Sequence, residues 1–389
     1  MKVAILNLAF DLDLENAAAL VSRFATLARS SRALAEAGAS VTVLQRFRFD
    51  VDHVEQVDQG DPGGAAVRWH LRADDPKKAF SGPRARPVAL LRLARDLAPD
   101  AVLVNGLMFP EAVAELRARL PRTTAIALQH HGGGPNGLAL GLRQRALLRF
   151  ADGFLFTAQG LAAPWRLAGM IRERQPVFEV PESSSDFVPV EREEALRRTG
   201  VDGSPSLLWV GRLHARKDPL TAFRAAALAL VRLPGLRLFA AFGEEPMRPE
   251  VERLLAAEPA LAARTRLLGR LAHGDLPAWY SAADLFVTSS PDEGSNYALI
   301  EALACGLPAV ASDIPPHRAL AGESALFFPP GDAAAAADAI VRAAALVEGG
   351  AGPSHRIRAR FEAELSWSVV ARRTLASLDA LVRERRGTA

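Results

Sequence analysis

The most informative segment of the chain reads Pro291-Asp-Glu-Gly-Ser-Asn-Tyr-Ala-Leu-Ile-Glu-Ala-Leu-Ala-Cys-Gly-Leu-Pro308. It holds two glutamates, Glu293 and Glu301, with seven residues between them. A strand-like run precedes it, and we expect a short helix over about 295–305, ended by Gly306. Glu301 lies among apolar residues of that helix, where an ionised carboxylate is costly unless something binds it.

Outward from this segment, short apolar runs alternate with longer helical patterns in both halves of the chain. Such alternation predicts parallel sheets with helices on both faces. A polar linker at 180–190 separates the halves, so we expect two doubly wound domains with a ligand site at the carboxyl ends of the strands, in the cleft between them. The expected strands are 3–8, 40–44, 67–71, 100–105, 124–129, 153–157, 206–210, 236–241, 266–268, 285–288, 309–312 and 325–328. The final segment, 356–386, reads as helical and amphipathic.

Length and composition agree with two globular domains. The chain has 389 residues, of which 49% are hydrophobic and 23% charged, and a single cysteine that excludes an intrachain disulfide. That cysteine usage fits a reducing, cytoplasmic compartment. The first apolar run is short and ends at Asp11, which favours a buried strand over a signal peptide. No stretch is long and apolar enough to cross a membrane.

The net charge is only +3, but basic residues cluster between Lys77 and Arg95. One interpretation is an ordinary solvated face. The other is attraction to an anionic surface, such as lipid headgroups at the inner face of a membrane. Nucleic acid is disfavoured as a partner because no basic stripe is interleaved with aromatic residues.

Two cations follow the first strand of the second half. That strand ends at Gly211, and Arg212 and Lys217 lie in the loop before the next helix. Cations at this place can neutralise a diphosphate, Arg with a planar fork and Lys with a point charge. The alternative is that both are solvated loop residues.

The glutamate segment adds further binding groups. Gly294 allows close approach of the backbone to a ligand, and the helix start at Ser295 and Asn296 suits a phosphate or a sugar hydroxyl. The carboxylate of Glu301 can accept hydrogen bonds from a vicinal diol such as a ribose, although a helix glutamate paired with a buried arginine is the alternative. Glu293 can bind hydroxyls of a sugar.

The motifs together resemble the retaining glycosyltransferases of family four, which have the GT-B fold. The similarity covers roughly 207–367. It is carried by Val210-Gly-Arg-Leu with Lys217-Asp218, Ala283-Asp-Leu-Phe-Val-Thr-Ser-Ser-Pro-Asp-Glu-Gly294, Glu301-Ala-Leu-Ala-Cys-Gly-Leu-Pro308, Ala311-Ser-Asp313, Phe327-Phe-Pro-Pro-Gly-Asp332 and Glu364-Leu-Ser-Trp367.

The resemblance implies a hexosyl transfer from a nucleotide-diphosphate sugar to a hydroxyl acceptor, with retention of the anomeric configuration and no metal or other cofactor. In such enzymes Arg212 and Lys217 would hold the diphosphate, Glu301 the ribose, and Glu293 with the 294–296 backbone the sugar and phosphates. The two glutamates would bind and orient the donor rather than act as the acid and nucleophile of a glycosidase.

The resemblance also implies the domain organisation. Residues 181–367 would bind the donor, and residues 1–180 would bind the acceptor, a glycan or lipid-linked sugar in polysaccharide, glycolipid or glycoconjugate biosynthesis. The last helix, 368–386, would pack back on the first domain.

A histidine pair follows the strand expected at 124–129. In the family a histidine at this strand end lies near the transferred sugar, where it can donate to a hydroxyl or handle a proton. We assign His131 to that place, with His130 as the alternate and a strand-capping histidine as the other interpretation. The first loop, 10–16, lacks the glycine pair often found in the family, so no contact with the donor is assigned there.

Other functions remain open. Gly132-Gly-Gly-Pro-Asn-Gly137 fits the Gly-x-Gly-x-x-Gly pattern of an NAD-dependent oxidoreductase, but the next strand ends in Ala158-Gln159 without the acidic residue that such a site needs. The His-Gly-Gly-Gly run resembles an esterase oxyanion segment, but no Gly-x-Ser-x-Gly occurs. A non-catalytic nucleotide-sugar or carbohydrate-binding protein on the same fold is the alternative from a different class.

Overall fold

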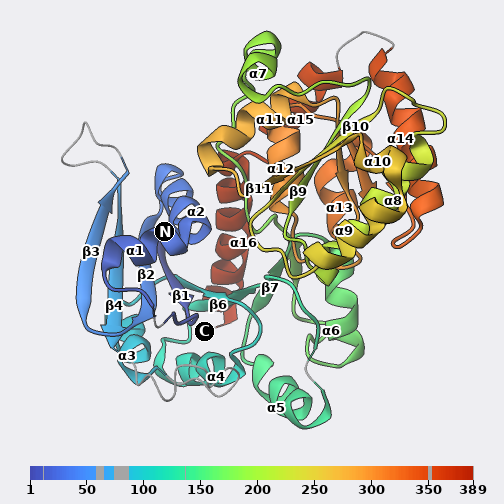
Figure 1. Ribbon diagram of the computed structural model, residues 1–389. Coiled ribbons are helices and arrows are strands. Elements are labelled where there is room, and N and C mark those ends of the chain that lie inside the picture. Colours follow the sequence, from blue (N-terminus) through green and yellow to red (C-terminus); the bar gives the residue numbers. More distant parts are fainter. Residues whose placement is uncertain (12, 58–64, 74–86, 136, 349–352, 389) are drawn as a thin grey trace. The chain divides into compact units, whose positions relative to one another are not determined.

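The computed structural model describes residues 1–11, 13–57, 65–73, 87–135, 137–348 and 353–388, and the chain divides into two compact units. One unit comprises Met1–Ser183 together with Trp367–Ala389, and the other comprises Ser184–Ser366. Residues 181–190 contain no helix or strand and lead from the first unit into the second. Figure 1 shows the course of the chain through both units.

The N-terminal unit is an eight-stranded sheet with the order β3-β4-β2-β1-β5-β6-β7-β8. All neighbours in it are parallel except β3 and β4. Its strands are β1 (Lys2–Asn7), β2 (Ser40–Phe47), β3 (Val51–Gln56), β4 (Ala66–Ala73), β5 (Ala101–Asn105), β6 (Ala125–Gln129), β7 (Gly153–Phe156) and β8 (Val177–Glu179). Its helices are α1 (Ala17–Arg23), α2 (Ala25–Glu36), α3 (Val88–Leu97), α4 (Pro110–Arg119), α5 (Leu138–Leu148), α6 (Ala163–Leu167) and α16 (Trp367–Thr388).

The C-terminal unit is a six-stranded parallel sheet with the order β11-β10-β9-β12-β13-β14. Its strands are β9 (Ser206–Gly211), β10 (Arg237–Phe242), β11 (Thr265–Gly269), β12 (Leu285–Thr288), β13 (Ala309–Ser312) and β14 (Ala325–Phe328). Its helices are α7 (Arg192–Thr199), α8 (Pro219–Ala229), α9 (Arg248–Ala257), α10 (Pro259–Ala262), α11 (Leu276–Ala282), α12 (Tyr297–Ala304), α13 (Pro315–Ala321), α14 (Ala333–Glu348) and α15 (Pro353–Glu364).

Each sheet is buried on both faces, which is why its strands read as continuous apolar runs. Along β1, Val3 and Ile5 pack in one core cluster while Leu6 packs in a second cluster on the opposite face. Along β9, Leu208 and Trp209 divide in the same way between two clusters of the C-terminal unit. Side chains alternate between the faces of a strand, so a two-layered core follows from these runs.

The segment expected to be helical at 356–386 forms two helices, α15 and α16. The amides of Leu365 and Ser366 both bond to the carbonyl of Phe361, at 2.8 and 2.9 Å, and this closes α15 before α16 begins. Helix α15 contacts α12 within the C-terminal unit, whereas α16 contacts α2 and β6 within the N-terminal unit. The break therefore lies where the chain passes from one unit to the other.

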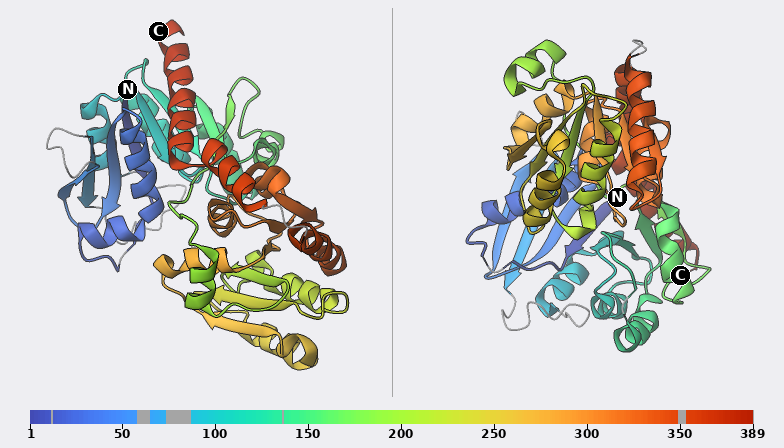
Figure 2. Two further views of the ribbon diagram at one scale, coloured as in Figure 1. Left: turned by 90° about the horizontal axis from the view of Figure 1, so that it is seen from above. Right: turned by 45° about the vertical axis from the view of Figure 1, so that its right-hand side comes forward.

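A glycine lets the last helix approach the N-terminal sheet closely. A Cβ on Gly153, at the start of β7, would come within 3.0 Å of the Leu381 side chain on α16. The end of α16 is also held by charge, because Arg385 pairs with Asp152 and Arg386 pairs with Asp100. Figure 2 shows this long helix from two further directions.

The basic cluster singled out at 77–95 lies largely outside the described residues. Of its members, Arg92 and Arg95 lie on α3, where Arg95 pairs with the neighbouring Asp96 at 2.7 Å on the surface. In the part of the chain that the structure describes, no helix is long and apolar enough to cross a membrane.

Candidate functional site

The C-terminal unit brings Lys217 and Glu293 into direct contact. Strands β9 and β12 are parallel neighbours, so the loops that follow them leave the sheet at the same edge. Lys217 Nζ donates to Glu293 Oε1, and Ser290 Oγ donates to the same oxygen at 2.8 Å. Both charged side chains are mostly buried, with 19% of Lys217 and 9% of Glu293 exposed. The ammonium of Lys217 and the carboxylate of Glu293 thus lie in contact at the carboxyl ends of β9 and β12.

The backbone around Lys217 fixes this arrangement. Ser289 Oγ bonds to the carbonyl oxygens of Lys217 and Asp218, at 3.2 and 2.6 Å. Asp218 adopts a positive φ of 42° and caps α8 by accepting a hydrogen bond from the amide of Thr221. Because Asp tolerates the left-handed region and makes a good helix cap, it can turn the chain sharply there. The loop is therefore tied to the end of β12 on the side facing Glu293.

A second buried network supports the start of α12. Asn296 caps this helix through the amide of Leu299, and its Nδ2 reaches Thr288 Oγ1 and His317 Nε2, each at 3.0 Å. His317 Nδ1 lies 2.9 Å from the carbonyl of Ser312. Burial lowers the pKa of His317 to about 4, so the ring is neutral and donates from Nδ1 while Nε2 accepts from the amide. This network positions the glutamate loop and contains no net charge.

Glu301 lies on α12 in an apolar setting, as expected, but its partner is not an arginine. Tyr280 donates its hydroxyl to Glu301 Oε2 at 2.9 Å, and His273 Nδ1 lies 3.9 Å from Oε1. Burial raises the pKa of Glu301 to about 7, and the hydrogen bond from Tyr280 offsets part of that rise. Only 15% of the side chain is exposed, so one carboxylate face opens outward without a strong cation beside it.

The remaining predicted donor groups lie around these two glutamates. Gly294 and Ser295 are buried, and Ser295 Oγ has no hydrogen-bond partner within the described residues. Gly211 ends β9 against the ring of Trp209, where a Cβ would come within 3.1 Å of the indole. Arg212 follows it with half of its side chain exposed, 3.6 Å from Glu244. The structure thus joins Lys217 to Glu293 and leaves Arg212 facing solvent.

The two histidines of the N-terminal unit have different surroundings. His130 is buried, stacks on Phe156 at 4.6 Å, and uses both ring nitrogens on the backbone of Gly132 and Gly133. His131 is exposed, and its Nδ1 lies 3.2 Å from Oε2 of the buried Glu182. This contact leaves Nε2, the other nitrogen of the His131 ring, for a hydrogen bond to a ligand. His131 is therefore the histidine that is open to a ligand, and His130 is a packing residue.

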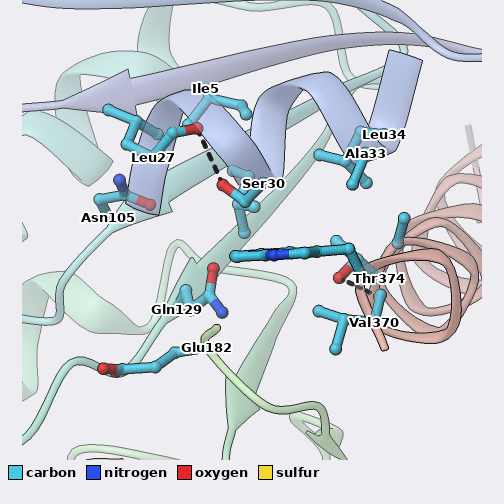
Figure 3. Close-up of a pocket in the computed structure, with 13 residues that line it drawn as sticks. Ile5, Leu27, Ser30, Ala33, Leu34, Asn105, Gln129, Glu182, Val370 and Thr374 are labelled. Carbon is cyan, nitrogen blue, oxygen red and sulfur yellow. Dashed lines mark hydrogen bonds between the residues drawn. The ribbon is translucent and has the colours of Figure 1, made fainter. Parts of the chain in front are cut away.

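A small cavity lies beside the carboxyl ends of β5 and β6 in the same unit. Its lining includes the strand-end residues Asn105 and Gln129, with Ser30 on α2, Thr374 on α16 and Glu182, as Figure 3 shows. The volume is about 20 Å³, which is space for roughly one water molecule. This cavity is too small to hold a sugar ring, so it is interior packing rather than a substrate pocket.

Several of these residues have no signal in the sequence. His317 and Tyr280 meet the glutamate segment only through the fold, and Glu182 meets His131 in the same way. Ser290 alone has a signal in the sequence, because it belongs to the polar run that follows the buried strand expected at 285–288.

Residues 204–345 match the family of glycosyl transferases group 1. The resemblance inferred from the sequence is confirmed, and the matched stretch contains Lys217, both glutamates and His317. The GT-B fold class is confirmed as well, since solved structures that resemble this chain along its whole length, such as a sucrose-phosphate synthase, have the GT-B fold.

Curated relatives among the glycosyl transferases match the chain only in part. A D-inositol 3-phosphate glycosyltransferase of Thermobispora bispora is 35% identical over 136 residues, covering 33% of this chain and 32% of that protein. An alpha-D-kanosaminyltransferase of Streptomyces kanamyceticus is 31% identical over 153 residues, 39% of either chain. The chain thus spans about a third of the length of the curated relatives that it matches.

Solved structures match over the whole length at low identity. A sucrose-phosphate synthase from Thermosynechococcus elongatus has a TM-score of 0.70 at 20% identity and covers 100% of both chains. The Anabaena protein HepE, solved in complex with UDP, has a TM-score of 0.70 at 16% identity, covering 98% of this chain and 100% of that one. At these identities the likeness shows the fold alone.

Proposed function

We propose that this protein is a retaining, metal-independent glycosyltransferase that uses a nucleotide-diphosphate sugar. The observation that carries the proposal is the contact between Lys217 and Glu293 at the ends of β9 and β12, inside the matched stretch 204–345. The partly matching relatives are named as glycosyltransferases, and HepE was solved with UDP, which supports a nucleotide-linked donor.

In the proposed reaction, the bond from the anomeric carbon to the diphosphate oxygen breaks, a bond from that carbon to an acceptor hydroxyl oxygen forms, and the hydroxyl proton passes to the departing diphosphate. Negative charge grows on the departing diphosphate. Lys217 sits at the loop where this charge would develop, and the exposed Arg212 can swing to the same phosphates. Cations that bind the leaving group more tightly in the transition state than in the ground state raise the rate.

Glu293 and the start of α12 would hold the sugar and its phosphates. When a diphosphate attracts Lys217, Glu293 keeps the hydrogen bond from Ser290 and offers its other oxygen to a sugar hydroxyl. The buried Gly294, the unpartnered hydroxyl of Ser295 and the capping Asn296 lie beside the first amides of the helix. Free amides and a hydroxyl at a helix start suit phosphate oxygens.

Glu301 would accept hydrogen bonds from both ribose hydroxyls. Its apolar surroundings and the donor hydroxyl of Tyr280 leave capacity for two more hydrogen bonds on the carboxylate. Binding a diol would favour the ionised form and lower the raised pKa. His131, oriented by Glu182, would contact the transferred sugar or its acceptor from the N-terminal domain.

The acceptor and the location belong to the same proposal. Residues 1–180 would bind a glycan or lipid-linked sugar, in polysaccharide, glycolipid or glycoconjugate biosynthesis. The enzyme would act in the cytoplasm with peripheral contact to the inner face of the membrane.

The test is a panel of sugar nucleotides scored by thermal stabilisation, followed by turnover with the one that binds. A ligand that binds only the folded state raises the melting temperature. Product analysis by NMR then reports the anomeric configuration, and activity in excess chelator tests metal independence. If no sugar nucleotide stabilises the protein, the proposal fails.

A non-catalytic binding protein on this fold makes a different prediction. It would be stabilised by the same nucleotides but would not release free nucleoside diphosphate from the donor. A transferase hydrolyses its donor slowly even without an acceptor, so a coupled diphosphate assay separates the two functions.

A further inference from the structure

Four arginines of the N-terminal unit line one open pocket. Arg145 on α5, Arg166 on α6, and Arg172 and Arg174 in the following loop surround a space of about 520 Å³. Figure 1 shows α5 and α6 in this unit. Among the described residues that line it, Glu173 is the only acidic one, so four arginines and one glutamate give a net charge of +3. None of these lining residues belongs to the basic cluster at 77–95 or to the groups assigned to the donor.

The backbone holds two of these guanidinium groups in place. Arg166 donates to the carbonyls of Arg172 and Gln175, at 3.1 and 3.3 Å. Arg145 lies against Gly169, whose φ is +66° and where a Cβ would come within 2.9 Å of Arg145 Nε. The close approach is possible because Gly169 has no side chain. Two backbone carbonyls thus orient the guanidinium of Arg166, and that of Arg145 packs against the backbone of Gly169.

No ion pair holds these arginines across the described ranges, whereas Arg117, Arg143 and Arg385 of the same unit each pair with a carboxylate. Like charges around one pocket repel each other, so an anion inside it relieves the repulsion. Arginine forks match the oxygens of a phosphate group in a planar, two-pronged geometry. The pocket is thus built for a phosphate-bearing ligand.

Two exposed leucines adjoin the arginines. Leu142 is 63% exposed and lies three residues before Arg145, on the same face of α5. Leu167 is 90% exposed and follows Arg166 at the end of α6. A single exposed leucine needs no explanation, but basic residues interleaved with exposed apolar ones are typical of surfaces that lie at a membrane interface.

We propose that this pocket binds the phosphate group of an anionic phospholipid, with Leu142 and Leu167 entering the headgroup layer. The negative surface potential of the membrane attracts the basic side chains, and the leucines bury apolar area in the headgroup layer. Both effects favour binding. The inference deepens the proposed membrane contact by giving it a site. Its test uses no sugar donor, so its failure and the failure of the transferase proposal can be told apart.

The experiment is sedimentation of the full chain with vesicles of phosphatidylcholine alone or mixed with phosphatidylglycerol. Arg145→Gln and the double variant Arg172→Gln/Arg174→Gln remove charge from the pocket. Each arginine near an anionic surface contributes about a fivefold gain in partition, so we expect losses of about fivefold and about 25-fold. Arg253→Gln removes the same charge from the exposed face of α9 and is the matched control, with partition unchanged.

A leucine variant and a change of ionic strength test the apolar and the electrostatic contributions to vesicle binding separately. Leu167→Ser should weaken partition without altering its salt dependence, because it removes apolar area and no charge. Raising the ionic strength should release the parent protein, since screening shortens the range of the attraction.

Competition with inorganic phosphate distinguishes a lipid headgroup from a soluble phosphate compound as the ligand of the pocket. Under the proposal, millimolar phosphate displaces the parent protein from anionic vesicles only weakly. If the vesicles are not bound, or are bound equally by the arginine variants and the parent, the proposal is wrong. If phosphate stabilises the parent but not Arg145→Gln while no vesicle is bound, the pocket holds a soluble phosphate compound and the lipid assignment is overturned.

Discussion

Replacing Glu301 with glutamine should make the folded protein more stable at alkaline pH while weakening nucleotide binding. The carboxyl of Glu301 has its pKa raised from 4.5 to about 7 by burial. The folded pKa thus lies above the unfolded value, so stability is lost as the pH rises from about 4.5 through about 7. A glutamine cannot ionise, and it can still accept the hydroxyl of Tyr280, so the variant avoids that loss.

The size of the effect follows from the same pKa. A rise from 4.5 to about 7 corresponds to about 3 kcal/mol that the ionised carboxylate costs the folded state above pH 7. Glu301→Gln should therefore unfold at a similar denaturant concentration to the parent near pH 5 and at a clearly higher one at pH 8. Glu252→Gln on α9 makes the same change at an exposed ion pair and should have almost no effect.

The affinity of Glu301→Gln for nucleotide should fall, although its stability at pH 8 should rise. A neutral amide offers one acceptor to the ribose where the carboxylate offers charge-assisted bonds to both hydroxyls. Each bond to a charged group contributes about 1.5–3 kcal/mol, so we expect roughly 10- to 100-fold weaker binding of UDP or another matching nucleotide by calorimetry at pH 8. If Glu301→Gln lowers stability at pH 8 and leaves affinity unchanged, Glu301 is a structural residue and the ribose assignment is wrong.

Four further outcomes follow from the site. Lys217→Met should lower kcat by about 100-fold, measured as diphosphate release, because it removes a cation from the leaving group; full activity would refute its role. Glu293→Gln should raise KM for the sugar nucleotide more than Kd for the free nucleoside diphosphate. If both constants change equally, Glu293 does not contact the sugar. Glu182→Gln and His131→Asn should each slow transfer with nucleotide affinity intact, and the double variant should be no slower than His131→Asn alone. Nucleotide affinity of the parent should rise as the pH passes 7 and stay flat in Glu301→Gln, since only the ionised carboxylate accepts both hydroxyls.

The sequence predicts the parallel core strands because both faces of each sheet are buried. Strands such as β1 and β9 read as apolar runs between helices, and their bounds agree within two residues of the expected ones. Strand β3 was missed because its exposure alternates and it pairs antiparallel at the sheet edge. Strand β8 was missed because it has only three residues, too few for a periodic signal.

The sequence also misses where helices end within a continuous helical pattern. The chain between the strands expected at 3–8 and 40–44 forms two helices that meet at Phe24, and the helical segment at 356–386 forms two helices separated at 365–366. In each case the residues around the break have ordinary helix propensity. At 365–366 the helix ends because α15 and α16 pack in different units, which is a tertiary cause that the local pattern does not contain.

The candidate site was predictable where one loop or one motif supplies the chemistry. Lys217 and Glu293 each follow a buried strand, and parallel neighbours bring such loops to one edge. Tyr280 and His317 lie on helices before and after the glutamate segment, and nothing in their local sequence marks them as its partners. Of the two adjacent histidines, only packing separates the buried His130 from the exposed His131.

The two glutamates of the segment differ in a way that bears on their roles. Glu293 has an ammonium and a hydroxyl on one oxygen, so its charge is matched before any ligand arrives. Glu301 has a single neutral donor in an apolar pocket, and its raised pKa leaves it partly protonated near pH 7. A ligand at Glu293 must therefore compete with Lys217, whereas a ligand at Glu301 supplies hydrogen bonds that the carboxylate lacks. An anionic diphosphate that draws Lys217 away and a diol that donates to Glu301 meet both conditions, and one nucleotide-diphosphate sugar contains both groups.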